Sequence, residues 1–242
     1  PPLEQTLLSR GYALAASGVA TTDWQMKEEV QDTLTLAAYF RGRVGVPKRV
    51  IIWGTSLGGL VSLRLIEEFP RAFDGAIATC GGLAGWSRRW DRLLDFSLAY
   101  AVAFGWPVEA WGPVEDLRDD LNFARDVSPR VQWPGADGSN RGGWEFIRLV
   151  SGVTSEAFWA TDPGLGITGF AAHMLFATEM RSGAEAWAAG PVAQNAGRQY
   201  TLKPEEKTYL AGLGVNSEDL LAKMNSRANI PASPLSRDYM RR

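Results

Sequence analysis

The chain has 242 residues, of which 45% are hydrophobic and 21% are charged, a composition typical of a folded globular protein rather than a disordered one. Its 25 Lys and Arg residues are balanced by 27 Asp and Glu residues, which disfavours a nucleic-acid-binding protein, since that class normally carries a basic excess. The single cysteine, Cys80, excludes an intrachain disulfide and a Cys-cluster zinc site, and the single histidine, His173, leaves little for acid–base or metal chemistry.

Neither a membrane-spanning helix nor a signal peptide is predicted. The longest apolar candidate, 96–106, is shorter than the roughly 18 residues that a bilayer requires. The first residues lack an initiating Met and the basic and apolar stretches of a signal peptide. The sequence therefore leaves the compartment open, and it gives no indication of the oligomeric state.

The first third of the chain alternates patterns of strands and helices. The apolar run 12–16 predicts a buried strand, and 24–41 predicts an amphipathic helix capped by Thr22 or Asp23. A β-branched run at 49–53, without alternation, predicts a strand covered on both faces. A helix over about 57–69 and a third strand over 76–80 complete two right-handed βαβ units with a parallel sheet. The fold class predicted is α/β.

The remainder of the chain follows a helical rhythm and holds eight of the ten tryptophans, between residues 86 and 190. We expect a strongly apolar helix at 90–102, a helix that begins at Pro113, a flexible loop at 135–143, and further helices at 144–150, 170–180, 205–213 and 218–226, the last capped by Asn216 or Ser217. Prolines 231 and 234 favour an extended tail. The tryptophans either pack this region or line an apolar pocket, and the sequence does not separate the two.

The motif with chemical meaning is Gly54-x-Ser56-x-Gly58, which lies between the predicted strand 49–53 and the predicted helix 57–69. A strand that turns at once into a helix strains the residue at the corner, and we expect the two glycines to remove side chains that would collide there. The turn would hold the Ser56 hydroxyl above the carboxyl end of the sheet. The backbone N–H of Leu57, at the helix N-terminus, would stabilise an oxyanion. A phosphate-binding turn is disfavoured because GxGxxG is absent.

These residues resemble the α/β-hydrolase superfamily, with 11–15, 50–59 and 73–81 similar to its strands and its nucleophile elbow. The resemblance covers about Leu7 to Gly85 and implies that Ser56 is the nucleophile of a Ser–acid–His triad. It also implies a partial core with about three strands at 1–85, a large helical cap or lid at 86–230, and a linker at 231–242 that returns to the rest of the core.

The chain departs from the family pattern in its missing triad partners. No predicted strand after Gly85 is followed by an acid, and His173 falls in a helix-like part of the cap, where we interpret it as a partly buried cap residue rather than the base. We therefore expect the chain to be an interior fragment. Earlier strands and an oxyanion loop would lie upstream, and the acid and the histidine would lie downstream.

The leading functional hypothesis is a serine hydrolase that cleaves a small carboxylic ester or other acyl substrate through an acyl-enzyme on Ser56, with the Leu57 N–H in the oxyanion hole. A peptidase or thioesterase on the same scaffold is an alternative, and a non-catalytic domain that binds a ligand or partner through the cap is another. No cofactor and no metal are predicted. Cys80 is interpreted as an inert core thiol, and Arg88, Arg89, Asp119 and Asp120 as solvated faces of cap helices.

Overall fold

The computed structural model describes residues 2–18, 24, 26–81, 86–162 and 166–239 of the chain. These residues form two compact units, 1–84 and 85–242, and each is described by itself. The helix caps expected at Thr22 or Asp23 lie outside the described residues. No helix among the described residues is long and apolar enough to cross a membrane.

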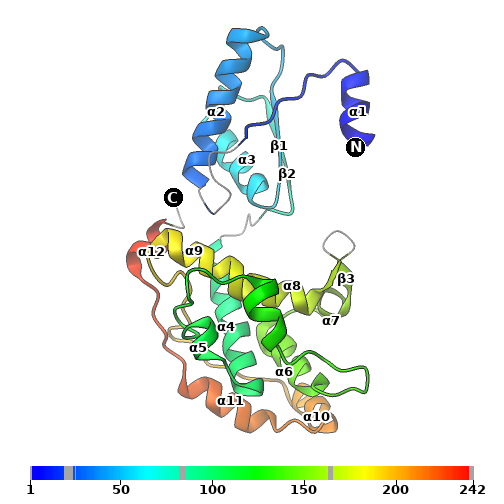
Figure 1. Cartoon of the computed structure of the whole chain (residues 1–242), viewed down its shortest axis with the longest axis vertical. Coiled ribbons are helices and arrows are strands. Elements are labelled where there is room, and N and C mark those ends of the chain that lie inside the picture. The colour runs from blue at the N-terminus through cyan, green and yellow to red at the C-terminus, as the bar shows by residue number, and fades with distance from the viewer. Residues whose placement is uncertain (1, 19–23, 25, 82–85, 163–165, 240–242) are drawn as a thin grey trace. The chain divides into compact units, whose positions relative to one another are not determined.

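The first unit contains a βαβ arrangement with helices packed on one side of its two strands (Figure 1). Its elements in chain order are α1 (Pro2–Ser9), α2 (Met26–Arg43), β1 (Ile51–Thr55), α3 (Leu57–Glu68) and β2 (Gly75–Thr79). Strands β1 and β2 pair in parallel, with Ile51 opposite Gly75 and Thr55 opposite Thr79. The helix predicted at 24–41, the helix at 57–69 and the strands at 49–53 and 76–80 are therefore confirmed, with boundaries shifted by a few residues.

One face of this small sheet carries the core of the unit. Ile52 is buried with Val30 of α2, Val61 and Leu65 of α3 and Phe73. The prediction of a strand covered on both faces is wrong for the described residues, since Ile51 is 51% exposed and Trp53 is 49% exposed on the opposite face.

The predicted strand 12–16 is also wrong, and the described residues contain one βαβ unit rather than two. The residues before it form α1 instead, and this helix ends at Gly11, which has a φ of +83°. The Gly11 N–H donates to the Leu8 carbonyl and the Tyr12 N–H donates to the Leu7 carbonyl, as at a typical glycine-terminated helix end. Tyr12 and Leu14 are exposed, so the apolar run buries little surface.

The second unit is helical apart from a short antiparallel pair (Figure 1). Its elements are α4 (Trp86–Phe104), α5 (Val108–Trp111), the π-helix η1 (Phe123–Val127), the 3-10 helix η2 (Ser128–Arg130), α6 (Arg141–Ser151), α7 (Ser155–Trp159), β3 (Thr161–Asp162), β4 (Ile167–Thr168), α8 (Gly169–Leu175), the π-helix η3 (Phe176–Met180), α9 (Arg181–Ala188), α10 (Pro204–Gly212), α11 (Ser217–Ser226) and α12 (Pro234–Tyr239). Helix α4 is central, and α6, α11 and η3 pack against it.

The core of this unit is built from aromatic rings. Trp90, Trp111 and Trp144 have no exposed surface, and Trp144 packs against Phe96, Phe158 and other rings. Packing therefore accounts for these three tryptophans. Most of the expected helices are present, and Asn216 caps α11 by accepting a hydrogen bond from the Asp219 N–H.

The helix expected to begin at Pro113 is absent, and residues 112–121 form turns. The Arg118 N–H donates to the Trp111 carbonyl across a turn at Gly112, where φ is +77°. Glu185 of α9 accepts a hydrogen bond from the Leu117 N–H. Tertiary hydrogen bonds thus replace those of a local helix. The predicted loop is shorter than expected, since α6 already begins at Arg141.

The C-terminal segment was expected to be extended, but residues 234–239 form α12, which packs against α9. Arg237 forms an ion pair with Asp91 of α4 at 2.6 Å, and both side chains are largely buried. Ser236 is fully buried and donates a hydrogen bond to the Ala188 carbonyl. The role of 231–242 as a linker to further core elements stays a prediction.

Replacing Arg237 with alanine is expected to lower the free energy of unfolding by about 2 kcal/mol, between the values for exposed and fully buried ion pairs. Urea unfolding followed by circular dichroism measures this effect. The matched control is Arg227→Ala, whose ion pair with Glu115 spans 3.9 Å and is exposed on both sides. An equal loss in both variants would contradict the proposed contribution of the Arg237–Asp91 pair.

Candidate active site

Ser56 occupies the corner between β1 and α3, in an unusual backbone conformation. Its φ is +57° and its ψ is −118°, a combination rare for a residue with a side chain, which costs about 1–3 kcal/mol. The Ser56 N–H donates to the Thr79 carbonyl at the end of β2 at 2.9 Å, and its own carbonyl accepts from the Gly59 N–H at 3.0 Å. The corner is therefore fixed by both the neighbouring strand and the following helix.

Close packing explains one glycine of the motif. A Cβ on Gly54 would lie 2.0 Å from the Gly58 carbonyl oxygen and 2.7 Å from the Ser62 hydroxyl oxygen, so only glycine fits. Gly58 itself has open space among the described residues, and the expectation that both glycines prevent collisions is wrong for it. The second crowded position is Gly59, where a Cβ would lie 3.0 Å from the Thr79 carbonyl oxygen.

The Ser56 hydroxyl is exposed, and in the part of the chain that the structure describes it has no hydrogen-bond partner and does not cap α3. Leu57 is the first residue of α3, and N–H groups of a first helical turn lack acceptors within the helix. These N–H groups and the helix dipole favour negative charge near Ser56. The role of the Leu57 N–H as oxyanion donor stays a prediction.

In the first unit, Asp74 and Glu68 bind other groups and do not orient a base for Ser56. Asp74 accepts a hydrogen bond from the Val50 N–H at 2.7 Å and precedes β2, at the opposite end of the parallel strands from Ser56. Glu68 pairs with Arg64 at the C-terminal end of α3. The one histidine of the sequence belongs to the second unit. A triad is therefore not assembled among the described residues of 1–84.

Cys80 was interpreted as a core thiol, but the side chain is exposed. It follows β2 as Ser56 follows β1, and its φ is also positive, at +52°. Cys80 is exposed because β2 ends at Thr79, so Cys80 lies past the strand and outside its packed face.

His173 lies in α8 and is half-buried, as the interpretation of a cap residue expects. Its Nδ1 is 2.7 Å from the Gly169 carbonyl oxygen, and since a carbonyl can only accept, Nδ1 carries the proton. Its ring packs against Phe96, with centroids 6.0 Å apart. Burial, followed by the nearby charge of Arg89, lowers the pKa of His173, although the hydrogen bond to Gly169 opposes this change. The imidazole is thus neutral at pH 7, with Nε2 as the free acceptor.

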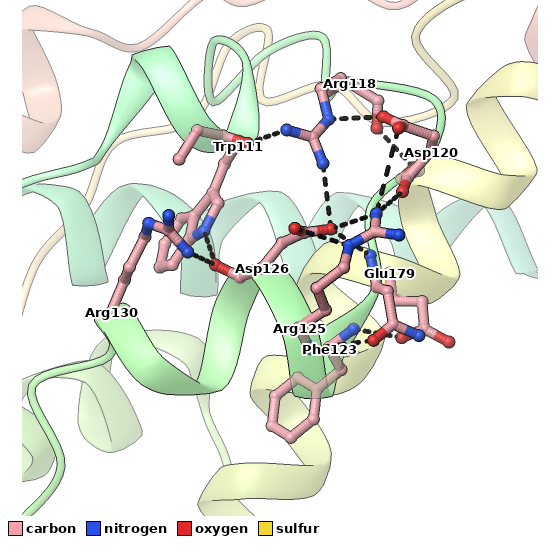
Figure 2. Close-up of polar contacts among 11 residues, drawn as sticks. Trp111, Arg118, Asp120, Phe123, Arg125, Asp126, Arg130 and Glu179 are labelled. Atoms are coloured by element: carbon pink, nitrogen blue, oxygen red, sulfur yellow. Dashed lines mark hydrogen bonds and ion pairs between the residues drawn. The ribbon is translucent and has the colours of Figure 1, made fainter.

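A polar cluster in the second unit has a structural role (Figure 2). Asp126 accepts hydrogen bonds from Arg118 at 3.0 Å, from Arg125 at 2.7 Å and from the Asn122 N–H at 3.0 Å. The hydrogen bond from Arg125 is the main cause of a strongly lowered pKa of Asp126. Asp120 is exposed, as expected, and pairs with Arg118. Because these charges satisfy one another, the cluster holds the turns at 112–121 against η1 and η2 rather than presenting free groups to a substrate.

Arg89 is exposed, as expected of a solvated helix face, and it also lines a pocket of about 200 Å³ together with Arg92 and His173. Both arginines still keep exposed surface. The signal that could have found this pocket is the spacing of Arg89, Arg92, Leu93 and Phe96, which places them on one face of α4. Among the described residues, no group of three His, Cys, Asp or Glu side chains is placed to hold a metal ion.

Comparison with known proteins gives one distant similarity. The chain is 27% identical over 157 residues to a protein named o-phthalyl amidase from Xanthobacter agilis. The match covers 63% of this chain and 34% of that relative, so it spans about a third of the relative's length. The similarity supports a hydrolytic enzyme. No family model and no solved structure matches the chain.

Proposed function

We propose that the protein is a serine hydrolase with an α/β-hydrolase-like core, and that Ser56 is the nucleophile that forms an acyl-enzyme with a carboxylic ester or amide. The observation that carries this proposal is the strained, exposed Ser56 at a strand–helix corner, with its hydroxyl unengaged among the described residues. Such a corner holds a hydroxyl beside the free N–H groups of a helix, where the negative charge of a tetrahedral intermediate is stabilised.

The chemistry proceeds in two steps. Ser56 Oγ bonds to the acyl carbon while its proton passes to a base and then to the leaving alcohol or amine. Water afterwards cleaves the acyl–serine ester and regenerates the hydroxyl. The distant relative's name favours an amide substrate. A serine at such a corner can equally well attack an ester, a thioester or a peptide, since each has a carbonyl carbon.

Reaction of the protein with a fluorophosphonate probe tests the proposal. We expect mass spectrometry to find the phosphonyl group on the peptide that contains Ser56, and Ser56→Ala to abolish labelling and to reduce turnover of phenyl esters and anilides at least ~10³-fold. The matched control is Ser9→Ala, an exposed serine of α1, which should label normally. A protein inert to the probe and to both substrate types would instead support a non-catalytic binding domain.

A further inference from the structure

The second unit contains a pocket lined by two arginines and several apolar side chains. It has a volume of about 200 Å³ and is lined by Arg89, Arg92, Leu93 and Phe96 of α4, Ser151 at the end of α6, His173 of α8, and Gly152, Val153, Thr154 and Ala157. An engineered apolar cavity of about 150 Å³ holds benzene, so a single ring with a small substituent fits a space of this size.

Arg89 and Arg92 carry charges that no acidic side chain pairs with among the described residues. Among the described residues, neither guanidinium forms an ion pair or a hydrogen bond. The pKa of Arg89 is lowered, first by partial burial and then by the neighbouring charge of Arg92. Asp95, whose charge interacts with that of Arg92, is already bound by Arg198 at 2.7 Å and by the Tyr200 hydroxyl at 2.7 Å. Two like charges thus lie close to each other, and among the described residues neither has an acidic hydrogen-bond partner of its own.

The other polar side chains of the pocket form hydrogen bonds with backbone groups. The Ser151 hydroxyl donates to the Ile147 carbonyl at 2.7 Å, Thr154 accepts from the Ala157 N–H at 3.3 Å, and His173 Nδ1 donates to Gly169. The guanidinium groups are therefore the charged donors available in the pocket, beside the Thr154 hydroxyl hydrogen. A planar guanidinium matches a carboxylate with parallel hydrogen bonds, and the Arg89 guanidinium is already oriented by the Phe176 ring, 5.5 Å from its centroid.

We propose that this pocket binds a small organic carboxylate, with the carboxylate between Arg89 and Arg92 and an aromatic or apolar body against Val153 and Ala157. Val153 and Ala157, the apolar lining residues that keep exposed surface, distinguish such a ligand from inorganic phosphate, which has no apolar part to cover them. The proposal concerns binding and holds whether or not Ser56 reacts.

The single histidine of the chain makes the pocket directly observable, because its ring gives one set of NMR signals. Benzoate added to the isotopically labelled full chain is expected to shift the His173 ring signals in a saturable way. Benzyl alcohol, which lacks the charge, and inorganic phosphate, which lacks the apolar body, should shift them at least ~10-fold more weakly. Equal binding of benzyl alcohol or of phosphate would overturn the proposal, as would unchanged signals with benzoate.

Substitutions on α4 provide the second test. Arg89→Gln and Arg92→Gln are each expected to weaken benzoate binding about 10-fold, since each removes a charged hydrogen-bond donor. Arg88→Gln is the matched control, because Arg88 is an exposed neighbour on the same helix outside the pocket lining, and it should change affinity less than twofold. Equal weakening by Arg88→Gln would show nonspecific attraction. Ser56→Ala should bind benzoate normally, so failure of the hydrolase proposal and failure of this one are distinguishable.

Discussion

Replacing Gly54 with alanine is expected to destabilise the first unit by at least ~3 kcal/mol, because the added methyl group would lie 2.0 Å from the Gly58 carbonyl oxygen. Neither atom can move cheaply, since Gly54 belongs to β1 and Gly58 to the first turn of α3. The strand or the helix must shift, and the Ser56 corner between them shifts as well. We expect loss of amide protection from hydrogen exchange in 50–80, measured by mass spectrometry, because this readout separates the first unit from the second.

The matched control for this substitution is Gly58→Ala. The described residues leave open space beside Gly58, and alanine favours a helix by about 1 kcal/mol over glycine. We therefore expect unchanged or slightly increased protection. Equal losses in the two variants would show that the motif needs both glycines for a reason other than the packing seen here, and full tolerance of Gly54→Ala would contradict the geometry of the corner.

Replacing Arg181 with methionine is expected to destabilise the second unit by about 3–5 kcal/mol, the usual effect of leaving a buried charge without its partner. Arg181 of α9 has no exposed surface and lies 3.1 Å from Glu185, which is also buried. Its guanidinium also donates to the Val114 carbonyl in the turns that follow α5. Differential scanning calorimetry at pH 7 measures the loss, and Lys223→Met, which breaks an exposed pair with Asp219 four residues away, is the control with an expected effect below about 1 kcal/mol.

The pH dependence of this deficit identifies its cause. Burial raises the pKa of Glu185, and the charge of Arg181 opposes that effect, so the pKa should rise further in Arg181→Met. A carboxyl with a raised pKa in the folded state binds its proton more tightly there than in the unfolded chain. Stability is then lost as the pH rises above the ordinary glutamate value of 4.5. We expect the deficit of the variant to shrink between pH 7 and pH 5. A deficit that is constant with pH would assign the loss to packing, and a second substitution, Glu185→Leu, should restore part of the stability.

Local signals were sufficient for the elements around Ser56. The β-branched run before Gly54 and the amphipathic spacing after Ser56 predicted a strand and a helix that both exist, and the corner between them has the positive φ expected of an elbow. The same kind of signal failed at 12–16 and at 113–121. An apolar run becomes a strand only beside a partner strand, and the described residues place none beside Tyr12. Pro113 and the acidic residues after it do not start a helix, because tertiary hydrogen bonds hold the backbone in another path. Glu185 binds the Leu117 N–H and Arg181 binds the Val114 carbonyl.

The Gly54-x-Ser56-x-Gly58 motif and the position of the single histidine, His173, already indicated that residues 1–85 hold a nucleophile candidate without a visible base. The sequence by itself determined the strand–Ser56–helix corner, because strand and helix propensity and glycine freedom act over a few residues. Only the tertiary structure decided that Gly54 and not Gly58 is crowded and that Cys80 lies past its strand. It alone brought Arg89 and Arg92 together with His173 around one pocket. The pocket joins residues that are distant in the chain, and the crowding at Gly54 depends on how closely β1 and α3 approach each other, because close packing is set by neighbours in space.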